Sequence, residues 1–495
     1  MPTAPTTYLN TPLAYTRNPA TFRRIFEAGR SSIIRIATLG DSQDTTPGGF
    51  GEPFNFGLNK ALSMFYGNSP ATCLNTGGNF GAFGSAHSVQ GKFGVAGRQA
   101  ISPAASTTPT SEVLPATTIQ CPNTTANYQS GQLGIFLMNN ISATCPFNRN
   151  SNYFDYSGGV RQETYAFTRS GASPMTIGNA YNATHAHSFT LSDFQTAIDF
   201  GQDNATLAIV KHVSNLMTAP TSSQYLQTGV KLSSGAGPIE VYGWRFLMEA
   251  ARFGAIVDAF GFGGYTTEQW LTAFNGTGKM LKGTGPYNIV TTGFGANDST
   301  TKTKAQFKAD TLSLIDYIRS AMGDGNFPII ITSDFERICA SAPIRAEYQQ
   351  YPIACWEIAN ENNNIMAVNY QRITNILGMT EADMTFTGLT SRGAWSSAAV
   401  AYVVNDYVAI DAFPGATGVT NRGTFWYKCV SNHTSSASNG PVDSQYWVPI
   451  CRFSFDTDGV HSNFFAADQI AQAGLQAMLS ASYANTVQDF RPWVR

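Results

Sequence analysis

Length, composition and charge already restrict what this chain can be. Its 495 residues suffice for two to four domains, and only 13% of them are charged, below the quarter or so that is usual in soluble proteins. A net charge of −2 without long charged runs speaks against a nucleic-acid groove and against attraction to anionic membranes. No apolar stretch reaches the length of a membrane span, and no basic-then-apolar secretory signal opens the sequence.

The first α/β pattern in the chain is a predicted strand followed by a predicted helix. Residues 33–39 (Ile-Ile-Arg-Ile-Ala-Thr-Leu) are mostly apolar and predict a buried strand, which ends at Gly40-Asp41-Ser42. After a Gly/Pro loop, an apolar stripe at helical spacing predicts a helix, formed by Leu58, Ala61, Leu62, Phe65 and Tyr66. This order is typical of the first unit of an α/β sheet.

From residue 91 to residue 246 the pattern changes. Turn residues recur every eight to twelve positions between short apolar runs, which predicts an inserted β-sandwich of the jelly-roll kind. Two of the six histidines, His185 and His187, alternate in this segment. Without a third ligand they indicate a solvated strand and not a metal site.

The α/β rhythm resumes at residue 254 and continues to the end of the chain. Strands are predicted at 254–261, 287–294, 327–333 and 365–368, with helices between them and a last helix over 464–480. Thr266 is a candidate cap for the first of these helices. The alternation predicts a doubly wound parallel sheet, interrupted again at 391–452 by an aromatic-rich, weakly charged segment that indicates a small β module.

Seven cysteines are dispersed without a C-x-x-C motif, so neither a zinc site nor a thioredoxin motif is predicted. Cys121 with Cys145, and Cys429 with Cys451, are close enough in sequence to pair. The chain is large enough to fold without disulfides, and mostly reduced, buried cysteines are expected.

Ser42 is the candidate nucleophile. It follows a buried strand, at the edge where open α/β sheets hold their ligands, and its backbone N–H can point at a developing oxyanion. Asn297 follows the strand 287–294 at the same edge, and its amide is a candidate oxyanion donor. The alternative is that Asn297 caps the next helix, because Asn297, Asp298, Ser299 and Thr300 are all good capping residues.

His461 is the candidate base, with Asp458 three positions earlier as the carboxylate that orients it. Asp456 is a second carboxylate close by. A further backbone oxyanion donor is expected from a glycine after another strand. Gly264 fits best because its distance from Asn297 is that of one β-α-β repeat, about 30 residues; Gly263 and Gly77 are the alternatives.

These motifs, in this order, resemble those of the SGNH (GDSL-like) hydrolase family. Gly40-Asp41-Ser42 is similar to the nucleophile block, with Gln43 where many members have Leu, and Gly264 is the loosest match. Gly295-Ala-Asn297-Asp298 and Asp458-Gly-Val-His461 are similar to the other two blocks. The resemblance covers 20–90, 247–390 and 453–485 and implies a flavodoxin-like sheet with a Ser42–His461–Asp458 triad and an oxyanion hole of Ser42, Gly264 and Asn297.

The insertion at 91–246 is similar in layout to family members that remove O-acetyl groups from bacterial polysaccharides or peptidoglycan. Segment 391–452 resembles a small chitin-binding-type carbohydrate module, in which aromatic rings would stack on sugars. The candidates are Trp426, Tyr427 and Trp447. The alternative is that Trp426 and Trp447 form the core of a tiny β fold.

The sequence thus predicts a serine esterase that removes short acyl groups from a polysaccharide, with no metal or organic cofactor. Its expected partner is a glycan substrate, with a homo-oligomer or virion assembly also possible. An extracellular or virion location is expected, with the cytoplasm as the alternative. The competing functions are a non-catalytic sugar-binding or structural virion protein on the same scaffold, and a lipid esterase or thioesterase.

Overall fold

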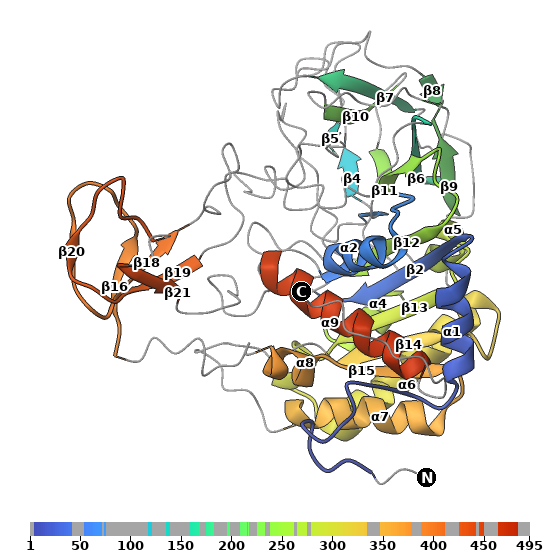
Figure 1. Cartoon of the computed structure of the whole chain (residues 1–495). Helices are drawn as coiled ribbons and strands as arrows, with labels where there is room; N and C mark the ends of the chain where they lie inside the picture. The colour runs from blue at the N-terminus through green and yellow to red at the C-terminus, as the bar shows by residue number, and fades with distance from the viewer. Residues whose placement is uncertain are drawn as a thin grey trace.

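The computed structural model describes most of the α/β framework and part of the two interruptions (Figure 1). The described residues are 4–41, 54–71, 74–75, 117–120, 135–138, 158–168, 175–182, 196–198, 208–214, 216, 225–232, 238–261, 265–274, 279–333, 347–377, 388–410, 425–441, 445–449 and 464–483.

A parallel sheet forms the centre of the molecule. Its strands are β2 (Ile33–Gly40), β12 (Gly254–Gly261), β13 (Ile289–Phe294), β14 (Ile329–Ser333) and β15 (Ile365–Asn369), in the spatial order β15-β14-β13-β2-β12. Numbered along the chain, this order is 2-1-3-4-5, the flavodoxin-like arrangement. The prediction of a mixed α/β fold around a parallel sheet is confirmed, and a short β1 (Ala14–Thr16) adds to β15 antiparallel.

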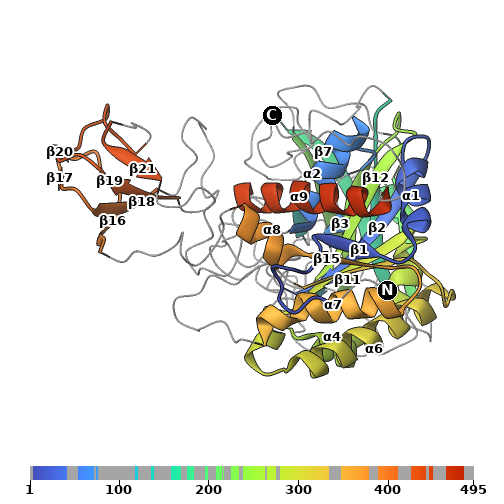
Figure 2. The same cartoon turned by 60° about the horizontal axis from the view of Figure 1, so that its bottom comes forward.

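Both faces of this sheet are covered by helices, because its strands are apolar at consecutive positions. Ile330 packs on one face, while Ile329 and Ile331 pack on the other. One face carries α1 (Pro19–Ala28), α2 (Phe54–Tyr66), α8 (Tyr370–Ile376) and α9 (Phe464–Ser482). The other carries α4 (Thr267–Phe274), α5 (Lys279–Thr284), α6 (Lys304–Met322) and α7 (Tyr351–Glu361), the last preceded by the 3₁₀ turn η5 (Tyr348–Gln350). Figure 2 shows α9 crossing the first face beside α2 and α1.

The first insertion extends the central sheet. The two-residue strand β3 (Leu74–Asn75) joins β12 to β11 (Pro238–Met248), and β11 pairs with β4 (Thr117–Gln120) and β6 (Val160–Thr168), which pairs with β9 (Ala208–Val213). A separate antiparallel sheet contains β5 (Ile135–Met138), β10 (Tyr225–Leu232), β7 (Met175–Asn182) and β8 (Thr196–Ile198). The described part of the insertion therefore consists of β-strands, as expected. Its packing as a sandwich and its boundaries at 91 and 246 stay predictions.

A buried charge network connects this extension to the parallel sheet. Arg245 on β11 is 1% exposed and contacts the carboxylates of Glu163 on β6, at 2.5 Å, and of Asp258 on β12. Asp258 also accepts a hydrogen bond from Tyr287 at 2.8 Å and lies 3.2 Å from Arg35. Burial, with the Asp258 carboxylate adding to it, raises the pKa of Tyr287 well above its ordinary value.

The second interruption forms a small β module, drawn apart from the central sheet in Figures 1 and 2. One of its sheets contains β16 (Thr390–Ala394), β18 (Asp406–Ile410), β19 (Phe425–Cys429) and β21 (Trp447–Pro449), and the other β17 (Ala401–Tyr402) and β20 (His433–Thr434). Its core consists of Tyr402, Val408, Cys429 and Trp447.

Of the seven cysteines, the structure describes Cys355 and Cys429, and both are buried, as expected for these two. None of the helices in the described ranges is both long enough and apolar enough to cross a membrane.

Candidate active site

The candidate site lies at the carboxyl edge of the parallel sheet, between β2 and β13. The register aligns Gly40 with Gly293 on one side and with Gly261 on the other, so the three strands end at one level. The chain order reverses at β2, and ligands of open α/β sheets bind outside such a switch point. After β13 the chain turns at Gly295, whose φ of 137° is a conformation that favours glycine.

Asp41 and Asn297 meet at this edge although they lie far apart in the sequence. The Asn297 amide nitrogen Nδ2 donates to Asp41 Oδ2 at 2.9 Å and to the main-chain oxygen of Tyr265 at 3.2 Å. The Asp41 side chain is fully buried, directly before Ser42. One amide group thus connects the segments that follow β2, β12 and β13.

The structure does not show the Asn297 side chain as a helix cap. Asn297 precedes the 3₁₀ turn η4 (Asp298–Thr300), but its side chain makes no cap hydrogen bond. Helix α6 is capped instead by Thr303, which forms a capping box with Gln306. The Asn297 side chain is therefore directed to the sheet edge, where the oxyanion role requires it to be.

Both Nδ2 protons of Asn297 have protein acceptors in this structure. An amide NH₂ group has two donors, and Asp41 and Tyr265 account for both. These bonds fix the plane of the amide. Donation to a substrate requires one of the two bonds to be shared with the substrate oxygen or released to it.

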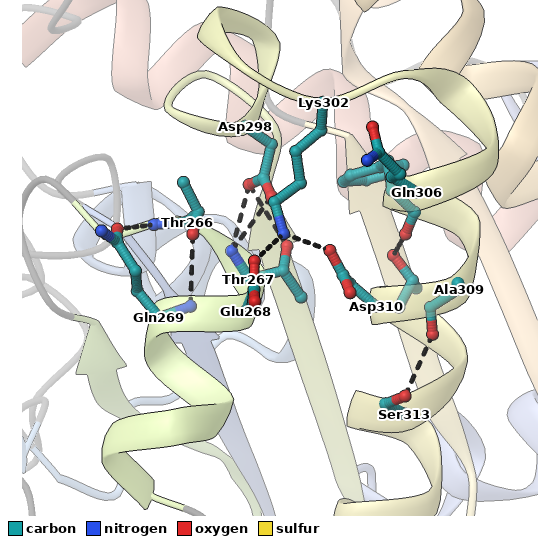
Figure 3. Close-up of polar contacts among 12 residues, drawn as sticks. Thr266, Thr267, Glu268, Gln269, Asp298, Lys302, Gln306, Ala309, Asp310 and Ser313 are labelled. Carbon is teal, nitrogen blue, oxygen red and sulfur yellow. Dashed lines mark hydrogen bonds and ion pairs between the residues drawn. The ribbon is translucent and has the colours of Figure 1, made fainter.

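Asp298 joins the loop after β13 to the start of helix α4 (Figure 3). Its buried carboxylate accepts hydrogen bonds from the Thr267 N–H, at 3.1 and 3.2 Å, and from the Thr267 hydroxyl at 3.2 Å. Thr266 and Gln269 form a reciprocal capping pair on the same helix, which confirms the cap predicted at Thr266.

Lys302 forms the next connection between α4 and α6. Its ammonium group contacts Glu268 at 2.7 Å and also Asp310, and the side chain is only 10% exposed (Figure 3). Burial alone lowers the pKa of Lys302, but hydrogen bonds to Asp310 and Glu268 outweigh it and raise that pKa above its ordinary value. Lys302 is thus held as a cation beside the loop of Asn297.

Helices α2 and α9, which follow the candidate nucleophile and the candidate base in the chain, pack together. An atom in the Cβ position of Gly57 would lie 2.6 Å from the Ala467 main-chain oxygen, so the two helices approach closely near their N-terminal ends. Lys60 and Asp468 form an ion pair at 2.6 Å one turn further along. The N-terminal halves of α2 and α9 are therefore in direct contact.

Several predicted residues lie outside the described residues, and their roles stay predictions: Ser42, Gly77, Gly263, Gly264, Asp456, Asp458 and His461, with His185 and His187 of the insertion. Residues that sequence reasoning did not assign are Asp41, Tyr265, Thr267 and Asp298. Asp41 and Asp298 stand inside the motifs quoted above, so adjacency to Ser42 and Asn297 was the available signal.

In the small module, the core alternative holds for Trp447. Its side chain is 1% exposed, and its indole N–H donates to the Asn439 main-chain oxygen at 3.1 Å. Trp447 therefore offers no ring face to a sugar, which corrects its assignment as a substrate-binding residue. Tyr427 packs half-buried against the same core, and burial raises its pKa; Trp426 lies on β19 between Tyr427 and Phe425.

No family model matches the chain, and no curated protein matches it either. Among solved structures, a peptidoglycan O-acetylesterase has a TM-score of 0.40 at 14% identity, covering 73% of this chain and 87% of that one. A family two carbohydrate esterase from Clostridium thermocellum, in complex with cellohexaose, has a TM-score of 0.19 at 13% identity, covering 43% and 82%. A carbohydrate acetylesterase from Xanthomonas citri has a TM-score of 0.21 at 9% identity, covering 64% and 95%.

These neighbours are esterases. Their names are of the class that the sequence resemblance predicts, peptidoglycan and polysaccharide O-acetyl esterases. At such identities and TM-scores they are similar proteins, and the residues of this chain have to carry any assignment of mechanism.

Proposed function

We propose that this protein is a serine esterase that removes O-acetyl or similar short acyl groups from a polysaccharide. The observation that supports it most is the hydrogen bond between Asn297 and Asp41 at the switch point of the sheet. It joins Asp41, the residue before Ser42, to the Gly295–Asp298 motif at one edge of the sheet, so we expect the Asn297 amide and the Ser42 hydroxyl to act at the same place.

In the proposed mechanism, the Ser42 hydroxyl attacks the ester carbonyl carbon while His461 takes its proton. Asp458 orients His461 and stabilises the imidazolium. The N–H groups of Ser42 and Gly264 and the Asn297 amide stabilise the oxyanion. As the C–O bond to the sugar breaks, His461 gives the proton to the sugar oxygen, and water then hydrolyses the acyl-enzyme by the same steps. The mechanism needs neither a metal nor an organic cofactor.

A glycan is the proposed substrate because of what surrounds the site. The insertion is β in its described part and extends the catalytic sheet beside β12, where it can contact a polymer. The chain is also poor in charge and rich in aromatic residues. An extracellular or virion-associated role, with glycan as partner, is part of this proposal.

Acetate release from a panel of O-acetylated bacterial glycans tests the proposal. The Ser42→Ala variant should lose turnover by about 10⁴-fold or more, because no other group replaces the nucleophile. Ser313→Ala is the matched control, because this exposed serine on α6 donates to the Ala309 main-chain oxygen within its own helix. Equal turnover in Ser42→Ala and the wild type would end the assignment.

A non-catalytic sugar-binding protein is the second candidate, and the engaged amide of Asn297 favours it. If both Nδ2 protons stay with Asp41 and Tyr265, the amide has no donor left for an oxyanion. This candidate predicts glycan binding without acetate release, and binding that is unchanged in Ser42→Ala. A lipid esterase would instead prefer long acyl chains in a p-nitrophenyl ester series.

A further inference from the structure

We propose that Asp298 is a positioning residue for the oxyanion site, acting through the N-terminus of helix α4. The inference rests on the proposed esterase function. In this proposal, Asp298 does not contact the substrate. It holds the backbone that follows β12 at a fixed distance from the Asn297 amide, which follows β13.

Three consecutive contacts join these two segments. The Tyr265 main-chain oxygen accepts from Asn297 at 3.2 Å, the Thr267 N–H and hydroxyl donate to Asp298, and Glu268 pairs with Lys302 at 2.7 Å. The contacts run in parallel along the two segments, so each fixes the register of the next. Gly264, the expected backbone donor, is the residue immediately before Tyr265.

Capping of α4 does not by itself explain why the Asp298 carboxylate is bound at the start of this helix. The helix already has a local capping pair, in which Thr266 and Gln269 satisfy each other's backbone N–H groups. Asp298 adds a carboxylate from another loop, and that carboxylate is fully buried. Burying a charge is costly unless it is hydrogen-bonded, and here the bonds are to a helix N-terminus, where a negative charge is stabilised.

The consequence for catalysis is geometric. An oxyanion hole works only if its donors lie where charge develops in the transition state, and a displacement of about 1 Å can cost about 100-fold in rate. Loosening the Asp298–Thr267 connection lets α4 and the preceding backbone shift against Asn297. Ground-state binding of the glycan depends on other surfaces and should change little.

The test compares Asp298→Asn, Thr267→Val and the conservative Thr267→Ser in the full chain, with acetate release as the assay. Asp298→Asn should lower kcat about 10- to 100-fold with KM changed less than about twofold. Affinity for methylboronic acid, which forms a tetrahedral adduct with an active serine, should fall by a similar factor. Thr267→Val should show a smaller effect of the same kind, and Thr267→Ser, which keeps the hydroxyl, should behave as the wild type.

Asp406→Asn is the matched control, since Asp406 is also a buried carboxylate that accepts a backbone N–H, from Val403 at 3.0 Å, but in the small module. It should leave kcat unchanged. The inference would be overturned if Asp298→Asn kept the kcat and the boronate affinity of the wild type. If Asp298→Asn does not fold, wild-type values in Thr267→Val would overturn it. Absence of acetate release and of serine labelling by a fluorophosphonate in the wild type would instead refute the proposed function.

Discussion

At the residue scale, Asn297 is the described residue on which the proposed chemistry depends most. Its amide is shared among three strand ends, and its closest acceptor is a buried carboxylate. A neutral amide can stabilise an oxyanion without adding a charge beside the proposed base. The residue therefore combines a structural contact with a proposed catalytic one.

Replacing Asn297 should affect rate and stability in different ways. Asn297→Ala removes one oxyanion donor and should lower kcat by about 10²–10³-fold with little change in KM, measured by acetate release. It also takes a donor from Asp41, at a cost of about 1–3 kcal/mol in unfolding free energy. Asn297→Asp places a second carboxylate beside Asp41 and should be the less stable of the two in thermal unfolding. A wild-type kcat in Asn297→Ala would contradict the assigned role.

At the scale of elements, α2 packs against α9, and these helices follow the candidate nucleophile and the candidate base in the sequence. The two helices are distant in sequence and belong to the first and last units of the sheet. Gly57 permits their close approach, with Ala467 and Ala471 as the facing residues. Small residues at such a crossing decide the distance between helix axes, and through it the separation of the loops that precede the helices.

A methyl group at Gly57 should therefore disturb both packing and rate. In Gly57→Ala the new Cβ would lie 2.6 Å from a main-chain oxygen and 3.1 Å from the Ala471 Cβ, so α9 has to move. We expect a loss of about 1–3 kcal/mol in unfolding free energy and a lower kcat. Gly325→Ala is the control, because a Cβ there meets open space. Equal stability of the two variants would show that α2 and α9 are not tightly coupled.

At the scale of the whole molecule, the β insertion and the α/β framework share one continuous sheet. Their junction has few backbone hydrogen bonds, because the connecting strand β3 has two residues. The charge network around Arg245 reinforces it with side chains from β11, β6 and β12. Because Arg245 has a carboxylate partner on each side of the junction, the buried network fixes the orientation of the extension relative to the parallel strands.

Breaking that network should destabilise the protein strongly. Arg245→Met leaves two buried carboxylates without their shared cation and should cost about 3–5 kcal/mol in urea unfolding. Neutralising both carboxylates as well, with Glu163→Gln and Asp258→Asn, should recover part of the loss. Lys308→Met, which breaks partly exposed ion pairs with Glu357 and Glu361, should change stability by about 1 kcal/mol or less. A loss in Arg245→Met no larger than that would show that the network does not hold the junction.

The sequence by itself determined the α/β framework and the order of its strands and helices, because apolar periodicity and capping residues are local signals. The stripe at Leu58, Leu62 and Phe65 and the cap at Thr266 led to the elements that the structure shows. It also placed Asn297 at a strand end, since motif and strand are contiguous. Strand β11 ends at Met248, two residues after the boundary predicted at 246, and that boundary stays a prediction.

Only the tertiary structure decided the rest, because contacts between distant segments leave no trace in local pattern. It chose between a cap and a sheet-edge role for Asn297 by bringing Asp41 and Tyr265 to its amide. It showed that Trp447 fills a core, where aromatic composition alone had allowed a sugar-binding face as well. It also showed what Asp298, Gly57 and Arg245 contact. The Asp298 carboxylate, the Gly57 backbone and the Arg245 cation each meet partners on other strands or helices, which the sequence pattern does not reveal.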